Sequence, residues 1–260
     1  EAGYKTYYIP ESTIYHFEGV TSGTDTCQGF KKYQEINRPK FKKRWSQTFS
    51  SHSSVGTKPD LEKDRNIVGR ILFIDYQLPR SDRDAGSYAA LQEIKLFQSL
   101  GFKATFIPES LEDLGGYKNA LQNDGVEVIT APFYLSTDSF LENRGSEFDV
   151  IYVTRYTILS SCIESIKRHC SEAKIILCNA DLHFLRELRA AARTKNPELI
   201  AKAKETQQSE IMMMSQADAV ISYNDIEHGI IYSHSDGTIQ PLKCPWVVEK
   251  PKRVIEQTIK

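Results

Sequence analysis

The chain carries the stretch Ile71-Leu-Phe-Ile-Asp-Tyr-Gln-Leu-Pro-Arg-Ser-Asp-Arg-Asp-Ala-Gly-Ser87, which constrains its fold more than any other segment. The first five residues form an apolar run typical of a buried strand, and the loop from Asp82 to Ser87 leads into a helix expected at Ser87–Leu100. A strand followed by a glycine-containing turn and a helix directs backbone N–H groups and the positive helix end to one place. That place suits a phosphate, a carboxylate or a sugar hydroxyl.

Further strands and helices alternate along the rest of the chain. The predicted strands are Ile71–Asp75, Lys103–Ile107, Val126–Thr130, Val150–Thr154, Lys174–Asn179, Ala219–Ser222 and Thr238–Leu242. The helices expected between them are Ser87–Leu100, Leu111–Asn123, Ser136–Arg144, Ile158–His169, Leu182–Gln216 and Asp225–Ser233. Several strands are continuous apolar runs, as in parallel strands covered on both faces. We therefore predict an α/β fold with a doubly wound parallel sheet, preceded by a small, mostly helical segment.

Glycine, asparagine and proline mark where several of these helices end. Gly101, Gly125 and Gly145 each lie just past an expected helix and are predicted to cap it. Asn196-Pro197 predicts a break inside the longest helix, with Asn196 capping the second segment.

Polar residues follow the predicted strands, at the edge of the sheet where ligands bind in doubly wound folds. Arg83, Gly86 and Ser87 follow the first strand and are candidates to contact a ligand, although an ordinary turn and helix start would also explain Gly86 and Ser87. Arg155 follows the fourth strand and is a candidate anion ligand, because an unpaired guanidinium at a strand end is costly. A local salt bridge of Arg155 to Asp149 or Glu187 is the alternative.

The fifth strand is followed by Asp181 and His183, which are candidate catalytic residues. A histidine here can act as a general base on a hydroxyl or hydrogen-bond to a sugar, because its ordinary pKa is near neutral. Asp181 has a second interpretation as the N-cap of the long helix.

Composition excludes several classes of function. The 260 residues include 33 Lys and Arg against 34 Asp and Glu, so charge gives no reason to expect nucleic acid. The five cysteines form no C-x-x-C pair, which favours free thiols in a reducing cytoplasm over disulfides or zinc. No G-x-G-x-x-G follows the first strand, and Ile107-Pro108 stands where a ribose-binding acidic residue is expected, so an NAD enzyme is not predicted.

The start of the chain does not follow the strand and helix alternation. An amphipathic basic helix is expected over residues 29–49, with a kink near Pro39, and residues 50–66 have linker composition. We therefore predict a first segment at 1–49, a linker at 50–66 and the sheet domain at 67–260. Because Glu1 is not a methionine, we expect the chain to be an excised fragment.

The first segment resembles the carboxyl-terminal end of a family-two, GT-A-fold glycosyltransferase. The resemblance is carried by Tyr8-Ile-Pro-Glu-Ser-Thr-Ile-Tyr-His-Phe-Glu-Gly-Val-Thr-Ser-Gly-Thr-Asp25, Lys32-Tyr-Gln-Glu-Ile-Asn37 and Lys40-Phe-Lys-Lys-Arg-Trp45. It implies that His16 ligates a divalent metal, Mn or Mg, beside the diphosphate of a nucleotide sugar. The carboxylates that complete such a site would lie upstream of Glu1.

The segment from Arg70 to Glu249 resembles the amino-terminal, Rossmann-like half of a GT-B glycosyltransferase of the kind that builds bacterial surface polysaccharides. The residues that carry this resemblance are Ile74 to Ser87, Glu147-Phe-Asp-Val-Ile-Tyr-Val-Thr-Arg155, Asp181-Leu-His-Phe-Leu-Arg-Glu187, Ala217-Asp-Ala-Val-Ile-Ser222 and Cys244-Pro-Trp-Val-Val-Glu249. It implies that Gly86, Ser87 and His183 face an interdomain cleft, and that a donor-binding half would begin after Glu249.

These resemblances predict a fragment of a bifunctional glycosyltransferase that uses a nucleotide-sugar donor and a growing polysaccharide or lipid-linked acceptor. The missing partners would be the GT-A core and the GT-B carboxyl-terminal domain, and the fragment alone should be inactive. We expect a cytoplasmic location. Most basic residues on the long helix should form a solvated face, and the alternative is a basic strip in peripheral contact with the inner membrane. The alternative is a non-catalytic, flavodoxin-like binding or regulatory module. A sugar-nucleotide epimerase would need a Tyr-x-x-x-Lys pair, which does not occur in the expected place.

Overall fold

The computed structural model describes residues 9, 12–17, 20, 23–57, 59–64, 66–235 and 237–248. Two compact units make up the chain, Glu1–Lys63 and Asp64–Lys260. The last residues of the predicted sheet domain, 249–260, lie outside the described ranges.

The described part of the first unit is made of short helices, and the three at residues 29–49 bury no residue. These helices are η1 (Gly29–Lys31), α1 (Lys32–Arg44), α2 (Ser46–Phe49) and α3 (Pro59–Glu62). Pro39 lies inside α1, and the helical run breaks at Trp45, where φ is −108° and ψ is 18°. The expected basic helix therefore exists as two pieces, and neither α1 nor α2 buries a residue.

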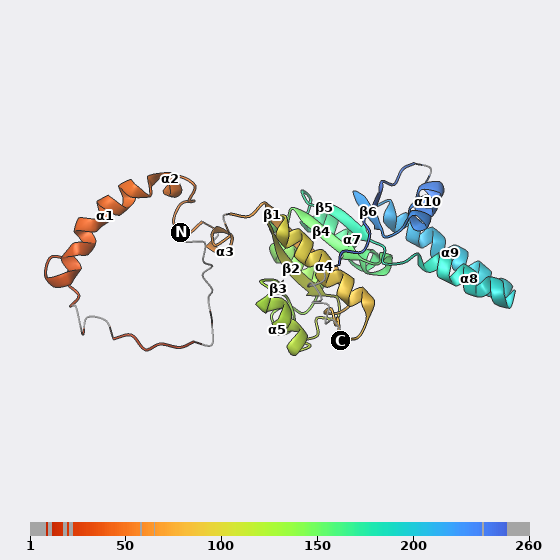
Figure 1. The fold of residues 1–260 in the computed structure, drawn as a ribbon, viewed down its shortest axis with the longest axis horizontal. Coiled ribbons are helices and arrows are strands. Elements are labelled where there is room, and N and C mark those ends of the chain that lie inside the picture. The colour runs from red at the N-terminus through yellow and green to blue at the C-terminus, as the bar shows by residue number, and fades with distance from the viewer. Residues whose placement is uncertain are drawn as a thin grey trace, which may run out of the picture. The chain divides into compact units, whose positions relative to one another are not determined.

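The second unit is built on a seven-stranded sheet in which every neighbouring pair is parallel. The strands are β1 (Gly69–Asp75), β2 (Phe102–Pro108), β3 (Glu127–Val128), β4 (Val150–Thr154), β5 (Lys174–Cys178), β6 (Ala219–Ser222) and β7 (Pro241–Lys243). Their spatial order is β3-β2-β1-β4-β5-β6-β7, which confirms the predicted doubly wound sheet (Figure 1). The order reverses between β1 and β4.

Helices cover both faces of this sheet. They are α4 (Ala85–Ser99), α5 (Gly116–Asn123), α6 (Thr137–Arg144), η2 (Gly145–Glu147), α7 (Tyr156–His169), α8 (His183–Thr194), α9 (Pro197–Met214) and α10 (Asp225–His234). Alternate residues of β1 point to opposite faces: Ile71 and Phe73 join the core under α4 and α5, whereas Leu72 and Ile74 join the core under α6, α7 and α9. Two buried cores therefore hold one rigid sheet between helical layers. None of the described helices is long and apolar enough to span a membrane.

Helix ends agree with the sequence in most places and differ in a few. Gly101 and Gly125 have positive φ angles of 92° and 79°, as predicted for residues that end helices. Gly145 also directly follows the last residue of its helix, Arg144, as predicted, but its φ is −55° and not positive, and it begins the 3-10 turn η2. The break at Asn196 is confirmed, because its side chain accepts a hydrogen bond from the Glu198 N–H at 2.9 Å.

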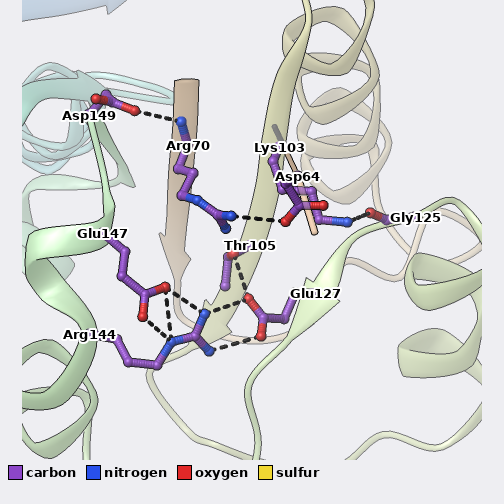
Figure 2. A network of polar contacts seen from close by, with 9 residues as sticks. All are labelled: Asp64, Arg70, Lys103, Thr105, Gly125, Glu127, Arg144, Glu147 and Asp149. Carbon is purple, nitrogen blue, oxygen red and sulfur yellow. Dashed lines mark hydrogen bonds and ion pairs between the residues drawn. The ribbon is translucent and has the colours of Figure 1, made fainter. Parts of the chain in front are cut away.

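A network of charges ties α6 to the edge of the sheet. Arg144, the last residue of α6, donates to both oxygens of Glu127 on β3, at 2.8 and 3.0 Å, and also bonds Glu147 at 2.8 Å (Figure 2). The buried hydroxyl of Thr105 on β2 donates to the same Glu127 carboxylate at 3.0 Å. Because β3 has only two residues, these side-chain bonds supplement its short backbone ladder.

Candidate functional site

The reversal in strand order leaves a pocket at the carboxyl ends of β1 and β4. In a doubly wound sheet this switch point is where ligands bind, because the connections from the two strands leave on opposite faces. We call it the switch-point pocket. It has a volume of about 290 Å³ and is lined by Asp75, Tyr76, Gln77, Asp84, Ser87, Arg155, Thr157 and Ile158. Two of the predicted substrate-binding residues, Ser87 and Arg155, thus lie in one pocket.

Arg155 is held over this pocket by Asp75. The parallel register pairs Ile74 with Val153, which brings the end of β1 beside the residues that follow β4. Arg155 Nη1 donates to Asp75 Oδ1 at 2.5 Å, although the two residues are 80 positions apart in the sequence. The alternative of a salt bridge to Asp149 or Glu187 is wrong: Asp149 accepts from the backbone N–H of Arg70 at 2.7 Å, and Glu187 accepts from Thr206.

The rest of the Arg155 guanidinium is available to a ligand. Its Nε and Nη2 bond no residue in the described part of the chain, and the side chain is 36% exposed. Asp75 is only 14% exposed and therefore fixes one edge of the guanidinium from inside the protein. The free edge keeps donors that match the oxygens of a phosphate or carboxylate.

The backbone of Arg155 adopts an uncommon conformation. Its φ is 74° and its ψ is 140°, in a region that residues with a side chain rarely occupy. Such a conformation costs about 1–3 kcal/mol and persists only where the surroundings enforce it. Here the Arg155 N–H donates to the Cys178 carbonyl at 2.8 Å, and its own carbonyl accepts from the Leu159 N–H at 3.2 Å. The sharp turn places the start of α7 directly at the pocket.

The two helices that begin at the pocket differ in how their N-termini are satisfied. At α4, Asp84 accepts from the Ser87 N–H at 2.7 Å and from the Ser87 hydroxyl at 2.8 Å. At α7 no side chain caps the helix, so the N–H groups of Tyr156, Thr157 and Ile158 bond nothing among the described residues. Unpaired N–H groups at the positive end of a helix form a favourable position for an anion.

The loop from Asp82 to Ser87 was expected to provide the open helix N-terminus at the ligand site, but it contributes only Asp84 and Ser87 to the pocket. Its Ser87 lines the pocket and is engaged by Asp84, whereas Gly86 lies in the first turn of α4 with an ordinary φ. Arg83 points into solvent, with a side chain that is 70% exposed and 3.6 Å from Asp82, and neither Gly86 nor Arg83 lines the pocket. The open helix N-terminus belongs to α7, on the other side of the switch point.

Burial and hydrogen bonding shift the pKa values of the two carboxylates in the pocket, Asp75 and Asp84, in opposite directions. Burial raises the pKa of Asp75, and the nearby Arg155 charge opposes this effect. The hydrogen bond from the Ser87 N–H lowers the pKa of Asp84, with help from the Ser87 hydroxyl and the Arg155 charge. Asp84 is thus held in its charged form at the rim, and Asp75 is the buried partner of Arg155.

His183 and Asp181 lie beside the pocket rather than in its lining. The His183 ring packs edge-on against Tyr156 with centroids 5.3 Å apart, and its Nε2 lies 3.2 Å from Asp181 Oδ1. Burial lowers the pKa of His183, which favours the neutral imidazole, and the Asp181 carboxylate opposes that shift. Asp181 also accepts from Arg186.

The prediction that Asp181 caps the long helix is wrong. Glu210 performs this role from α9: its two oxygens accept from the backbone N–H groups of His183 and Phe184, each at 3.1 Å. The Glu210 side chain is fully buried, and burial raises its pKa to about 7. Sequence gave no signal for this contact, because it joins positions 26 or 27 residues apart on two helices.

The proposed metal ligand His16 lies in the first unit and is exposed. In the described ranges no three His, Cys, Asp or Glu side chains lie close enough together to hold a metal ion. The described residues around His16 therefore do not provide a metal site by themselves.

The sequence did not indicate Thr157 and Ile158, which matter through their backbone N–H groups and not through their side-chain chemistry.

Neither a family model nor a curated protein matches the chain.

Proposed function

We propose that the sheet unit belongs to a glycosyltransferase that moves a sugar from a nucleotide-sugar donor to a growing surface polysaccharide or a lipid-linked glycan. The observation that carries the proposal is the switch-point pocket, where an oriented guanidinium and an uncapped helix N-terminus converge. The strand order agrees with the Rossmann-like half implied by the resemblance to GT-B enzymes. In this proposal, a donor-binding domain supplies the other wall of the cleft.

The chemistry of the pocket suits a ligand that carries both an anion and hydroxyl groups. A phosphate would bond the free edge of Arg155 and the N–H groups at the start of α7, while Asp84 can accept from a hydroxyl. The volume of about 290 Å³ is at the lower end for ligand pockets, so it holds one phosphate or sugar moiety and not a whole nucleotide sugar. His183, with its lowered pKa, would accept a hydrogen bond from an acceptor hydroxyl or position it.

The test is a transfer assay on the full-length protein. A panel of nucleotide sugars is offered, and both hydrolysis and transfer are measured. We expect Arg155→Gln to reduce kcat/KM by roughly 10- to 100-fold, because it removes a charged contact worth about 1.5–3 kcal/mol. Arg83→Gln is the matched control and should stay near the wild type, since Arg83 does not line the pocket. If no nucleotide sugar is bound or turned over, the proposed function is wrong.

The alternative, a flavodoxin-like regulatory module, fits the structure less well. Flavodoxin-like sheets have the strand order 2-1-3-4-5, whereas this sheet has β2 between β1 and β3 and reverses between β1 and β4. A phosphoacceptor aspartate at the end of the first strand would need to be accessible, and Asp75 is buried against Arg155. A protein that binds the donor without any transfer or hydrolysis would favour a non-catalytic module instead. Cytoplasmic location and contact with the inner membrane are also part of the proposal. The cysteines without a C-x-x-C pair support the first, and the basic residues of the long helix support the second.

A further inference from the structure

A buried carboxyl group, that of Glu93, lies on the face of α4 that packs against the sheet. The residue is 6% exposed, and the buried apolar residues Ala89 and Ile94 lie on the same helix. Burying a carboxyl group costs free energy unless hydrogen bonds compensate it. Because Ala89 and Ile94 already pack α4 against the sheet, the reason for this costly group has to lie in what it bonds.

Two tyrosines from different elements donate to Glu93. The Tyr152 hydroxyl, on β4, donates to Glu93 Oε2 at 2.9 Å, and the Tyr223 hydroxyl, directly after β6, donates to Oε1 at 2.8 Å. The Cys178 sulfur, at the end of β5, lies 3.0 Å from the Tyr223 oxygen. Burial raises the pKa of Glu93, and the two tyrosine hydrogen bonds oppose this effect. We call these four residues the buried tyrosine network.

The buried tyrosine network adjoins Arg155 through two of its members. Tyr152 lies three residues before Arg155 on the strand that leads into it. The backbone carbonyl of Cys178 accepts from the Arg155 N–H at 2.8 Å. The charge of Asp75, which holds the Arg155 guanidinium, also raises the pKa of Glu93, so these two carboxyl groups lie near each other. Both the strained backbone and the ion pair of Arg155 are therefore next to the network.

The helix that carries Glu93 also forms one wall of the switch-point pocket. Asp84 and Ser87, at the start of α4, line this wall, whereas Arg155 and Thr157 line the wall at the start of α7. A buried hydrogen-bond network favours a single arrangement of the elements that it joins. We propose that Glu93 is a positioning residue that sets the placement of these two walls and the orientation of Arg155. This role deepens the proposed function, because it rests on anion binding in the same pocket.

The first measurement is hydrogen exchange of backbone amides in the ligand-free 260-residue chain. Tyr152→Phe and Tyr223→Phe each remove one hydroxyl and keep the ring, which preserves the packing. In both variants we expect the Arg155 N–H to exchange about three- to tenfold faster, relative to the Asp149 N–H, which is hydrogen-bonded just before β4 begins. Glu93→Gln keeps an acceptor oxygen for the tyrosines and should stay close to the wild type.

The second measurement is binding of inorganic phosphate, followed by the amide chemical shifts of residues 156–158. Tyr152→Phe and Tyr223→Phe should weaken phosphate binding by about three- to tenfold, and Glu93→Gln should bind within about twofold of the wild type. Arg144→Ala is the matched control for lost stability, because Arg144 does not line the pocket. It should unfold more readily and still bind phosphate as the wild type does. A network that only stabilised the fold would leave the phosphate affinity of the folded protein unchanged.

The proposal is overturned if both phenylalanine variants keep the wild-type ratio of exchange rates at Arg155 and Asp149, or if both keep the phosphate affinity of a wild type that binds phosphate. It is also overturned if Glu93→Gln loses as much affinity as they do without a change in that ratio, since Glu93 would then act through its charge. If the wild type binds no phosphate but the phenylalanine variants exchange faster at Arg155, the positioning role holds and the anion site of the proposed function is wrong.

Discussion

Arg155 has a half-buried charge and a positive φ, both unfavourable, and each is stabilised by a neighbour, Asp75 or Cys178. Its guanidinium lies at a strand end in a half-buried position, and Asp75 neutralises it. Its backbone has a positive φ, and the hydrogen bond to Cys178 keeps it there. Strained residues of this kind are concentrated where a structure must hold a group in one orientation. The strain and the ion pair therefore support the same role for Arg155, as a donor held in a fixed orientation toward the pocket.

We predict that Arg155→Gly is more stable than Arg155→Ala. Both variants lose the ion pair with Asp75, but glycine accepts the positive φ of 74° at little cost and alanine does not. The free energy of unfolding, measured with urea, should be higher for the glycine variant by about 1 kcal/mol. At Arg83, which has no positive φ, the order should reverse, with alanine at least as stable as glycine. An alanine variant that equals or exceeds glycine at position 155 would show that the backbone there is not strained.

At the scale of elements, the sequence predicted what depends on local pattern. The strands at β4 and β6 have the predicted bounds, and the helix break at Asn196 lies where Asn-Pro predicted it. The strand expected at Val126–Thr130 is only Glu127–Val128, because β2 pairs with those two residues alone. The helix expected from Leu111 begins at Gly116, because Leu111 and Gly115 both have positive φ angles, which a right-handed helix excludes.

The partners of the site residues could not be predicted, because they come from the alignment of distant elements. Ser87 and Arg155 were found from their places after strands, a rule that needs only the strand pattern. The pairing of Arg155 with Asp75 requires the register of β1 against β4, and the capping of α8 by Glu210 requires the packing of α9. Neither the register nor the packing can be predicted from the spacing of nearby residues. The sequence therefore indicates partners that are close along the chain: Asp149 for Arg155, and Asp181 as the cap of the long helix.

The charge network of α6 makes a prediction about stability. Arg144→Ala would leave Glu127 and Glu147, which are 32% and 18% exposed, without their shared partner. We expect the free energy of unfolding to fall by about 2 kcal/mol or more, because partly buried charges lose their compensation. Lys174→Ala is the control, since its pair with Asp218 is 73% and 41% exposed and should contribute much less to stability. Equal losses in the two variants, measured by urea unfolding, would contradict this role of Arg144.

The contact between α8 and α9 makes a prediction about pH. The pKa of Glu210 rises from an ordinary value of 4.5 to about 7 in the folded protein, so the folded state binds its proton more tightly than the unfolded state. Its contribution to stability is therefore complete below about pH 4.5 and is lost as the pH rises to about 7, by an amount on the order of 3 kcal/mol. Glu210→Gln has no such proton and should flatten this slope. Unfolding free energies at roughly pH 5 and 7.5 measure it.

The control for this measurement is Glu205→Gln, which changes an exposed residue of the same helix and should keep the wild-type slope. Other buried carboxyls with raised pKa values, Asp75, Glu93 and Glu227, change stability in the same direction, so the wild type and the control share that background. A Glu210→Gln variant with an unchanged slope would mean that Glu210 does not titrate in this window.

For the whole molecule, the buried residues show that the second unit contains the hydrophobic cores and that helices α1 and α2 of the first unit contribute none. Both hydrophobic cores lie within the second unit, between Ile71 and Ile239. The switch-point pocket is also built from this unit alone, at the carboxyl edge of its sheet. In contrast, α1 and α2 bury none of their residues and carry exposed aromatic side chains such as Phe41 and Phe49. The sheet unit therefore contains what is needed for its own stability.

We predict that a chain truncated to residues 64–260 folds like the intact chain. Its free energy of unfolding should agree within about 0.5 kcal/mol, because both hydrophobic cores belong to the second unit and the truncation removes no residue of either. Urea unfolding followed by far-UV circular dichroism measures this. The truncation keeps Asp64, whose carboxylate accepts from Arg70 at 2.9 Å. A chain that begins at residue 69 is the comparison, since it lacks that ion pair and should be less stable. If the 64–260 chain is itself strongly destabilised, residues of the first unit must complete the core of the second.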